Sequence, residues 1–269
     1  MAAAVSADAR PATVLVLGGT SEARALAAEL AGRPGLRVIS SLAGRVANPA
    51  LPAGEVRVGG FGGAAGLAGW ARAEGVDAVV DATHPFAQTI SAHAVEACAR
   101  AGLPLLRLAR PGWDAREGDD WHHARSLGQA AEMLPALGTR VFLTTGRQGL
   151  AAFAALDHLW FLIRCVEPPA GPMPARRELL LARGPYGREA EWELMRRFGI
   201  DVLVTKNSGG PLTAGKLDAA RDLGIPVIMI SRPDGAPAVS VPDVDDAVRW
   251  VLAQVRGDGR PGPAHNAGA

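Results

Sequence analysis

Short apolar runs alternate with longer segments rich in alanine, leucine, arginine and glutamate along most of the chain. Continuous apolar runs of this length predict strands buried on both faces, and the longer segments have the composition of helices. The predicted strands are 13–17, 36–40, 77–82, 103–108, 140–145, 159–165, 201–205 and 225–231. The predicted helices are 20–31, 64–74, 87–101, 126–136, 186–198, 212–223 and 243–254. This alternation predicts an α/β fold with mostly parallel sheets flanked by helices.

One stretch of the first half is similar to one of the second. "DAVVDATHP" leads to "ACARAGLPLLRLARP", and "DVLVTKNSGG" leads to "DAARDLGIPVIMISRP" over nearly the same length. Either the chain contains two related halves, or the similarity reflects only what any helix–strand unit looks like. Both alternatives are compatible with two α/β lobes, which we place at 12–115 and 116–256 because "PGWDAREGDD" is typical of a linker.

Composition excludes several classes of protein. The chain has 269 residues, and a net charge of +1 gives no support to a nucleic-acid surface. No apolar run reaches the roughly 20 residues that a membrane-spanning helix needs, and the first residues lack the apolar core of a signal peptide. We therefore expect a cytoplasmic protein, a monomer or small homo-oligomer, with flexible ends at 1–11 and 257–269. Cys98 and Cys165 have no metal-type spacing and are predicted to be reduced, structural residues.

The loops that follow the predicted strands are polar and rich in glycine, and ligands bind at this end of parallel sheets. The first of them, "GGTSE", joins a strand to a helix. Its glycines let main-chain N–H groups approach a phosphate, and the helix N-terminus favours an anion. A plain helix-capping turn is the alternative. The predicted phosphate-binding residues are Gly18, Gly19, Thr20 and Ser21.

The loop after the second strand, "SSLAGR", lies where a nicotinamide dinucleotide places its adenosine ribose. An acidic residue there would suit a free 2′-hydroxyl, whereas an arginine suits the 2′-phosphate of NADPH. This loop has no acid, so NADPH is predicted in preference to NADH, unless Arg45 is only a solvated surface residue. The predicted contacts are Ser40, Ser41, Leu42, Gly44 and Arg45.

Two further loops of the first half could face the same ligand. "GGFGG" could let main chain lie against a ring through Gly60 and Phe61, or it could be a flexible connection. "DATHPFA" places Thr83 and His84 between a strand and a helix. His84 could bind the ligand or donate a proton, although helix capping explains the Thr-His pair equally well. Asp81 is predicted to be structural.

The second half offers cationic loops. "TTGRQG" repeats the strand–glycine–helix layout with Thr145, Gly146 and Arg147. Residues 164–188 contain five arginines, among them Arg183, which form either a solvated face or a rim that binds a polycarboxylate. "VTKNSGG" places a lysine at the end of a buried strand. Its predicted substrate-binding residues are Lys206, Asn207, Ser208 and Gly209, with Lys216 in the following helix.

The chain contains no HExxH motif, no metal-ligand spacing and no Ser-His-Asp or Cys-His signature. Hydride transfer needs none of these, because it requires only a cofactor held against the substrate and, in some cases, a proton donor.

Read together, the loops resemble those of the precorrin-6A reductase family of cobalamin biosynthesis. The matching stretches span about residues 13–233, and "DATHPFA" followed by "TKNSGG" is the most specific pair. The resemblance implies two Rossmann-like lobes with the active site in the cleft between them. It also implies NAD(P)H-dependent reduction of one double bond of the precorrin-6A macrocycle to give precorrin-6B. The cofactor would lie on the first-lobe loops, and Arg147, Arg183 and 206–209 would bind the acid-fringed ring.

The chain departs from the family pattern at Phe86, where a tyrosine is common, and near Ala214, where an aromatic residue is expected. The first departure leaves His84 and Lys206 as candidate proton donors beside solvent water, and the second leaves the role of Lys216 open. Tyr186 is not assigned to catalysis. Substrates with and without cobalt are both compatible with these motifs.

Two other functions are weighed against the reductase. One is an S-adenosylmethionine-dependent transferase of the same pathway, and Arg45, where that cofactor would require an acid, argues against it. The other is a non-catalytic nucleotide-sensing module, which would leave the cationic loops of the second half without a purpose.

Overall fold

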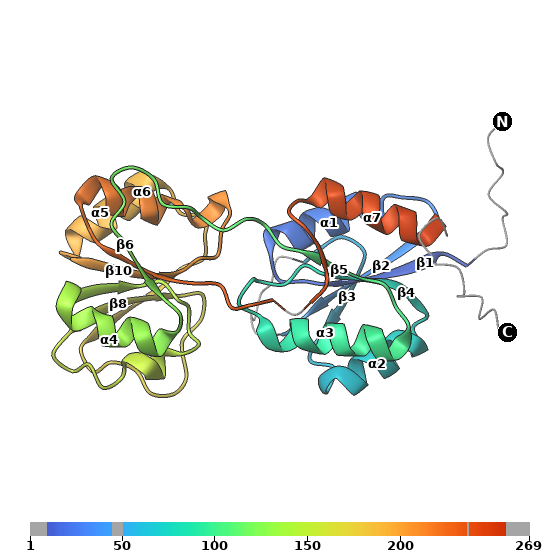
Figure 1. Cartoon of the computed structure of the whole chain (residues 1–269), viewed down its shortest axis with the longest axis horizontal. Helices are drawn as coiled ribbons and strands as arrows, with labels where there is room; N and C mark the ends of the chain where they lie inside the picture. Colours follow the sequence, from blue (N-terminus) through green and yellow to red (C-terminus); the bar gives the residue numbers. More distant parts are fainter. Residues whose placement is uncertain (1–9, 45–50, 236, 257–269) are drawn as a thin grey trace, which may run out of the picture. The chain divides into compact units, whose positions relative to one another are not determined.

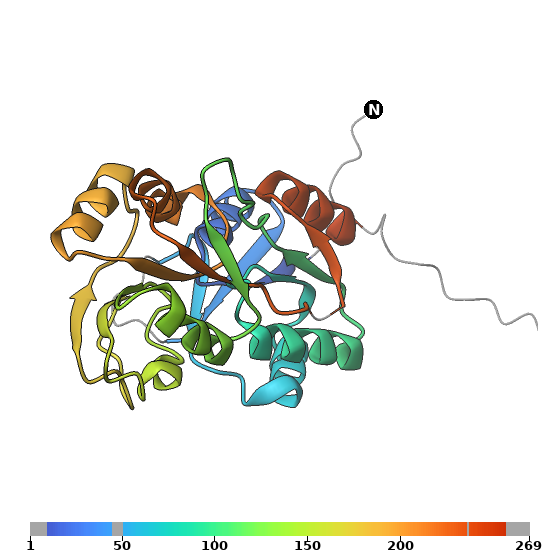
Figure 2. The ribbon, with the colours of Figure 1, turned by 60° about the vertical axis from the view of Figure 1, so that its left-hand side comes forward.

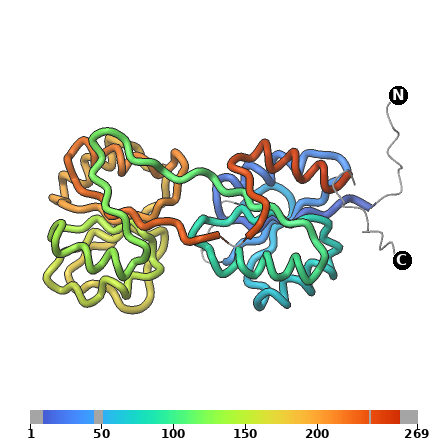
Figure 3. Tube along the Cα trace, in the orientation of Figure 1, coloured from blue at the N-terminus to red at the C-terminus, as the bar shows by residue number. Residues whose placement is uncertain are grey.

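The computed structural model describes residues 10–44, 51–235 and 237–256. The chain forms two compact units (Figures 1 and 3). The first combines the residues up to Arg110 with those from Gly235 onwards, and the second spans Pro111–Asp234. Figure 3 shows the two segments, one green and one orange-red, that connect the two units. Each unit is an α/β layer structure with its own core.

The first unit contains a six-stranded sheet in which every pair of neighbours is parallel. Its order is β12-β5-β4-β1-β2-β3. The five strands from β3 to β5 have the order 3-2-1-4-5 of doubly wound nucleotide-binding folds. The strands are β1 (Ala12–Leu17), β2 (Leu36–Leu42), β3 (Glu55–Val58), β4 (Val76–Asp81), β5 (Leu105–Leu108) and β12 (Val239–Val241).

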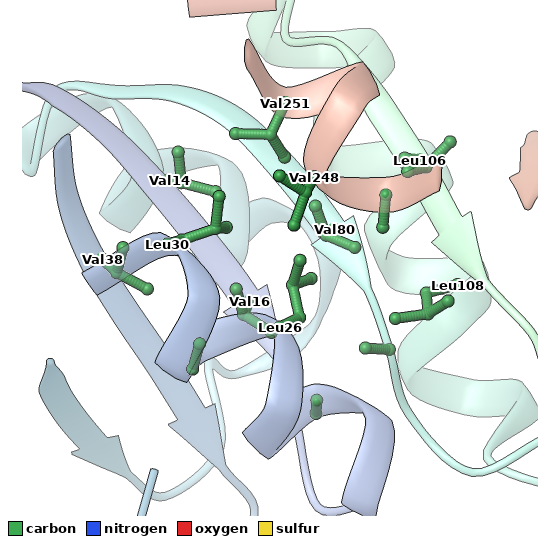
Figure 4. Close-up of a cluster of buried hydrophobic side chains, with 14 residues drawn as sticks. Val14, Val16, Leu26, Leu30, Val38, Val80, Leu106, Leu108, Val248 and Val251 are labelled. Carbon is green, nitrogen blue, oxygen red and sulfur yellow. The ribbon is translucent and has the colours of Figure 1, made fainter. Parts of the chain in front are cut away.

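Helices cover both faces of this sheet because successive side chains of a strand point to opposite faces. Helices α1 (Ser21–Ala31) and α7 (Val244–Arg256) cover one face (Figure 1), and Val14 and Val16 of β1 pack with them there, as Figure 4 shows. Leu15 and Leu17 pack against α2 (Gly63–Ala73) and α3 (Gln88–Ala101) on the other face. A strand buried on both faces gives the unbroken apolar run "VLVL".

The second unit repeats this plan with a parallel sheet of order β6-β11-β10-β7-β8-β9. Helices α5 and α6 pack on one face through Met195 and Leu217, and α4 covers the other. Figure 2 shows β9, in yellow, at one edge of the sheet. The elements are β6 (Trp121–Ala124), α4 (Leu127–Leu137), β7 (Arg140–Leu143), β8 (Trp160–Cys165), β9 (Arg177–Leu181), α5 (Arg188–Arg197), β10 (Val202–Lys206), α6 (Gly215–Leu223), β11 (Val227–Ile230), and the short 3-10 turns η1 (Leu150–Phe153) and η2 (Pro211–Thr213).

The structure places the two similar sequence stretches at equivalent positions. Strands β1 to β5 have the same order in the first sheet as β7, β8, β9, β10 and β11 in the second. The first stretch forms β4, α3 and β5, and the second forms β10, α6 and β11. The similarity therefore reflects two halves with one topology, each of which receives an additional edge strand, β12 or β6, beside its fifth strand.

The predicted boundary of the second lobe differs from the structure. Residues 116–256 were assigned to one lobe, but β12 pairs with β5 and α7 packs beside α1, so the described residues from Gly235 belong to the first unit. An apolar helix face indicates that a helix is buried, but it does not say against which sheet. The ends predicted to be flexible lie almost entirely outside the described residues, which begin at Arg10 and end at Arg256.

The strands that the sequence pattern did not predict are β3, β6, β9 and β12, and all four are sheet edges. Edge strands have one neighbour and expose more side chains, so they lack a continuous apolar run. Within the described part of the chain, no helix is long and apolar enough to cross a membrane. Both cysteines are unpaired and buried, and burial raises the pKa of Cys98 to about 12.

Candidate active site

The turn after β1 is open at its second glycine. The N–H of Gly18 donates to the carbonyl of Ser41 at 2.9 Å, which joins the turn to the end of β2. Gly19 has a φ of +112°, a conformation that side-chain-bearing residues rarely adopt, and no atom of the other described residues lies within 4 Å of where its Cβ would be. Main chain that is bare on one side can approach a phosphate closely.

Thr20 caps the helix rather than presenting a free hydroxyl. Its Oγ1 accepts the N–H of Ala23 at 3.0 Å and donates to the carbonyl of Ala82 at 2.8 Å. Thr20 is buried; the bond from Ala23 caps α1, and the bond to Ala82 holds the start of the helix against the end of β4. The capping alternative therefore describes the Thr20 side chain, and any phosphate contact in this turn comes from main-chain N–H groups.

An ion pair lies next to this turn. Ser21 Oγ donates to Glu22 at 3.0 Å, and Arg110 Nη1 lies 2.6 Å from the same carboxylate. Burial acts to raise the pKa of Glu22, but a main-chain hydrogen bond, Arg110 and Ser21 together hold that pKa below its ordinary value. Nothing in the local sequence indicates that Arg110 reaches back 88 residues to α1, so its role is visible only in the structure.

The end of β2 is polar and closely packed. Ser40 is 1% exposed, and no hydrogen-bond partner of its hydroxyl lies among the described residues. The Leu42 carbonyl accepts the N–H of Gly59 at 2.8 Å, and a Cβ on Gly44 would lie 3.1 Å from Val58. The loop after β2 is thus tied to the loop after β3. Arg45 lies outside the described residues.

The "GGFGG" loop is organised by an arginine that the sequence analysis did not select. Arg57 donates to the carbonyls of Gly59 at 2.6 Å and Gly60 at 2.7 Å, and its guanidinium carbon lies 3.8 Å from the Phe61 ring centroid. The only sign of this role in the local sequence is that Arg57 stands two residues before the glycine-rich loop. The loop is therefore an arranged element rather than a flexible connection.

The turn after β4 is fixed by Asp81. Its Oδ1 accepts the N–H of Thr83 at 3.1 Å and the Thr83 hydroxyl at 2.6 Å, so Asp81 is structural as predicted. His84 Nδ1 accepts the N–H of Phe86 at 3.2 Å. A neutral imidazole that accepts at Nδ1 carries its proton on Nε2. His84 is therefore arranged as a donor at Nε2.

In the second unit, the loop after β7 has a similar open glycine. Gly146 has a φ of +79°, and no atom lies within 4 Å of its Cβ position. Thr145 is buried, and no described residue bonds its hydroxyl. Arg147 lies 3.2 Å from Glu167, a carboxylate that the sequence analysis did not consider. Part of the Arg147 charge is thus compensated by the protein.

The five arginines of 164–188 do not form one basic rim. Arg164 is buried and pairs with Glu191, 2.8 Å between Nη2 and Oε2, and its guanidinium lies 3.6 Å from the Tyr186 ring centroid. Arg188 pairs with Asp222. Arg176 and Arg177 donate to the carbonyls of His158 and Pro174. Arg183 is exposed in the loop after β9.

Tyr186 is engaged in the same cluster. Its hydroxyl donates to the Ala182 carbonyl at 2.8 Å, and burial raises its pKa. A phenol whose proton is already donated inside the fold is poorly suited to protonate a substrate, so Tyr186 has a structural role in this cluster.

Lys206 ends β10 in a partly buried position, and burial lowers its pKa. The following loop is held by three side chains. Asn207 binds both main-chain groups of Trp113, and Trp113 Nε1 donates to the Gly210 carbonyl at 2.9 Å. Arg232 donates to the carbonyls of Asn207, Ser208 and Pro111. Asn207, which was expected to contact substrate, is therefore used inside the fold.

Lys216 is 4% exposed, which differs from its predicted contact with substrate. Its Nζ donates to the Thr213 carbonyl at 2.6 Å and lies 4.6 Å from the Trp113 ring centroid. Burial, followed by the nearby charge of Arg164, lowers its pKa to about 7. Because the first turn of α6 faces the core, a lysine there supports the 206–215 loop from beneath.

Each unit thus collects its predicted residues at the carboxyl end of its own sheet. In the first, the open Gly19, the orphaned Ser40 hydroxyl, the acid-free end of β2 and the His84 turn fit a dinucleotide. In the second, Gly146, Arg147, Arg183 and Lys206 provide donors and positive charge. No group of three or more His, Cys, Asp or Glu side chains that could hold a metal occurs between Arg10 and Arg256 wherever the chain is described.

The fold and these loops define a two-lobed α/β protein whose first sheet has the strand order of doubly wound nucleotide-binding folds. Comparison with known proteins identifies the family: the model of "Precorrin-6x reductase CbiJ/CobK" matches residues 13–252. The chain belongs to the precorrin-6x reductase family, which confirms the resemblance drawn from the loop motifs.

The similarity extends over almost the whole of the related proteins. The precorrin-6A reductase of Rhodococcus erythropolis is 60% identical over 239 residues, 88% of this chain and 96% of that protein. A solved structure of CobK precorrin-6A reductase is 41% identical with a TM-score of 0.85, covering 90% and 97% of the two chains. The cobalt-precorrin-6A reductase of Priestia megaterium is 30% identical over 256 residues, 90% of this chain and 99% of that protein. The two-lobed α/β fold predicted from sequence is confirmed.

Proposed function

We propose that this protein reduces one double bond of the precorrin-6A macrocycle to give precorrin-6B in cobalamin biosynthesis, with NADPH as the reductant. Membership of a reductase family implies a nicotinamide cofactor. The observation that carries the assignment is the 60% identity to a precorrin-6A reductase over 96% of that protein's length. The loops of the first unit support it, because they have the features that a dinucleotide requires.

The first unit would hold the cofactor. The bare main chain at Gly19 and the N-terminus of α1 would bind the pyrophosphate. Ser40 and Ser41 at the end of β2 would face the adenosine ribose, where the lack of an acid favours the 2′-phosphate of NADPH over the 2′-hydroxyl of NADH. When bound, the nicotinamide supplies a hydride, and the protein supplies position and a dry environment.

The second unit would hold the substrate. A precorrin carries carboxylate side chains around its ring, and Arg147, Arg183 and Lys206 offer the positive charges that such groups pair with. Arg147 would exchange part of its interaction with Glu167 for a substrate carboxylate. The open space beside the main chain at Gly146 would let uncharged main-chain donors approach the substrate.

Reduction adds a hydride to one end of the double bond and a proton to the other. Lys206 is the first candidate for the proton donor, because burial lowers its pKa and so makes the ammonium a stronger acid. His84 is the second candidate, but its neutral ring donates only a hydrogen bond at Nε2, and it would act as an acid as the imidazolium, which requires release of the Phe86 N–H from Nδ1. Solvent water remains a third source.

The natural substrate is proposed to lack cobalt. The 60% identical relative is named for precorrin-6A, whereas the relative named for cobalt-precorrin-6A is 30% identical.

Incubation of the purified protein with precorrin-6A and NADPH under anaerobic conditions tests the proposal. We expect loss of NADPH absorbance together with a product heavier by two hydrogen atoms, and slower turnover with NADH. Arg45→Ala should reduce the ratio by which the protein prefers NADPH over NADH. NADPH binding without any reduction of an authentic precorrin would contradict the reductase, and stabilisation by S-adenosylmethionine but not NADPH would support the transferase.

A further inference from the structure

We propose that Arg57 is a determinant of cofactor specificity, held at the end of β3 to receive the 2′-phosphate of NADPH. The inference rests on the proposed function, because it concerns the same cofactor. Arg57 lies in β3, next to the strand that precedes Arg45, and would be a second arginine for the 2′-phosphate.

Arg57 lies beside the ribose position. In the parallel pairing of β2 with β3, Arg57 is the register partner of Ser41, and Val58 is the partner of Leu42. The hydrogen bond from Gly59 to Leu42 then ties the two loops together at 2.8 Å. In doubly wound folds the adenosine ribose lies at the end of this second strand. A side chain at the end of β3 is therefore within reach of its 2′ substituent.

The guanidinium is held in place before any ligand binds. Its two terminal nitrogens donate to the carbonyls of Gly59 and Gly60, and its carbon lies 3.8 Å from the Phe61 centroid. Phe61 in turn makes an edge contact with Trp70, with centroids 5.3 Å apart. Ordering an arginine in advance removes the entropic cost of ordering it on binding, and these two bonds engage only two of its five N–H groups.

No carboxylate among the described residues neutralises the charge of Arg57. Five arginines of the first unit pair with carboxylates: Arg10 with Asp77, Arg37 with Glu55 and Glu74, Arg100 with Glu96, Arg110 with Glu22, and Arg249 with Asp246. Arg57 has only carbonyl and aromatic partners among the described residues. A partly buried cation without a carboxylate favours an external anion, and a phosphate matches the planar fork of a guanidinium.

The surrounding loop leaves room for the nucleotide. Among the described residues, Gly59, Gly60, Gly62 and Gly63 each have no neighbouring atom within 4 Å of their Cβ positions. Glycines that are bare on the outside of a loop, with a fixed cation beneath, are suited to the close approach of a sugar and its phosphate.

Binding measurements test the inference without any need for turnover. Dissociation constants for NADPH, NADH, 2′,5′-ADP and 5′-AMP would be determined by calorimetry for the wild type, Arg57→Met and Arg57→Lys. We expect Arg57→Met to weaken NADPH and 2′,5′-ADP by about 10- to 100-fold, the usual effect of a hydrogen bond to a charged group. NADH and 5′-AMP should change by less than about threefold, and Arg57→Lys should restore part of the preference.

Arg72→Met is the matched control, because Arg72 of α2 also donates to a carbonyl in this unit, that of Arg100. It should leave all four constants unchanged. If Arg57→Met weakens NADPH and NADH equally, Arg57 only shapes the loop and the inference is wrong, and an unchanged preference would overturn it as well. A wild-type protein that binds neither NADPH nor 2′,5′-ADP would instead refute the proposed cofactor, and the role of Arg57 with it. Circular dichroism and Arg57→Lys distinguish these results from a folding defect.

Discussion

The side-chain amide of Asn207 forms hydrogen bonds with both the N–H and the carbonyl of Trp113. Its Oδ1 accepts the Trp113 N–H at 2.7 Å, and its Nδ2 donates to the Trp113 carbonyl at 3.0 Å. The two residues are 94 positions apart, and Trp113 lies just after the chain enters the second unit. The loop that carries Lys206 is thus built against the segment that begins this unit, and its shape depends on that contact.

Asn207→Ala should destabilise the protein by about 1–3 kcal/mol, because it leaves two main-chain groups of Trp113 without partners. We expect a lower melting temperature and a loss of kcat, since Lys206 is the adjacent residue. Asn207→Asp keeps the acceptor but loses the donor, so its melting temperature and kcat should lie between those of the wild type and Asn207→Ala. Wild-type kcat in a destabilised Asn207→Ala variant would show that the contact supports the fold but not the site.

Lys206 can be tested as proton donor by separating its charge from its acidity. Lys206→Arg keeps a cation for the substrate, but a guanidinium does not give up its proton in proteins. If Lys206 is the donor, this variant should retain KM and lose about 10²- to 10⁴-fold in kcat. Lys206→Met should lose both.

The pH profile provides a second measurement for Lys206. Protonated lysine is the active form of a donor, so the wild-type rate should fall as the pH rises through the lowered pKa of Lys206. The Lys206 variants should lack that descending limb. His84→Gln would show the large kcat loss instead if the histidine is the donor, and an unchanged profile in both series would indicate solvent water.

Lys216 should reduce stability in a pH-dependent manner. Its pKa falls from an ordinary value of 10.5 to about 7 in the folded protein because it is buried. Between these values the unfolded chain binds the extra proton, so this residue makes stability rise with pH from about 7 towards 10.5. Lys216→Met removes that effect. Its melting temperature relative to wild type should therefore be highest near pH 6 and should decline as the pH rises, whereas a constant difference would contradict burial of a titrating amine.

Gly209 should tolerate no side chain. Its φ is +68°, and an added Cβ would lie 2.0 Å from the Pro111 carbonyl oxygen. Gly209→Ala should cost about 2 kcal/mol or more, because it combines a strained conformation with a main-chain clash. Gly224→Ala is the matched control, since Gly224 has a φ of +63° but open space around it, and should cost about 1 kcal/mol. Equal melting temperatures for the two variants would contradict the packing of the loop against Pro111.

Sequence patterns predicted those parts of the protein in which local composition reports the environment directly. Buried central strands such as 13–17 read as apolar runs, and Thr20 was recognised as a possible helix cap because capping depends on residues three positions apart. Loop motifs indicated the family, and the family model confirmed it. Gly18 and Gly19 were selected because a strand–glycine–helix turn is a local feature.

The tertiary structure decided what depends on distant partners. The helix Val244–Arg256 was predicted as a helix, but only its packing on α1 and the pairing of Val239–Val241 with β5 assign it to the first unit. In the sequence, Arg164 and Lys216 are cations that could bind a ligand. In the structure both are buried, Arg164 beside Glu191 and Lys216 beside Trp113. Arg57 became a candidate because strand register sets it next to Ser41. Hydrophobic periodicity encodes whether a residue is buried, whereas the partner that buries it is chosen by contacts between segments far apart in the chain.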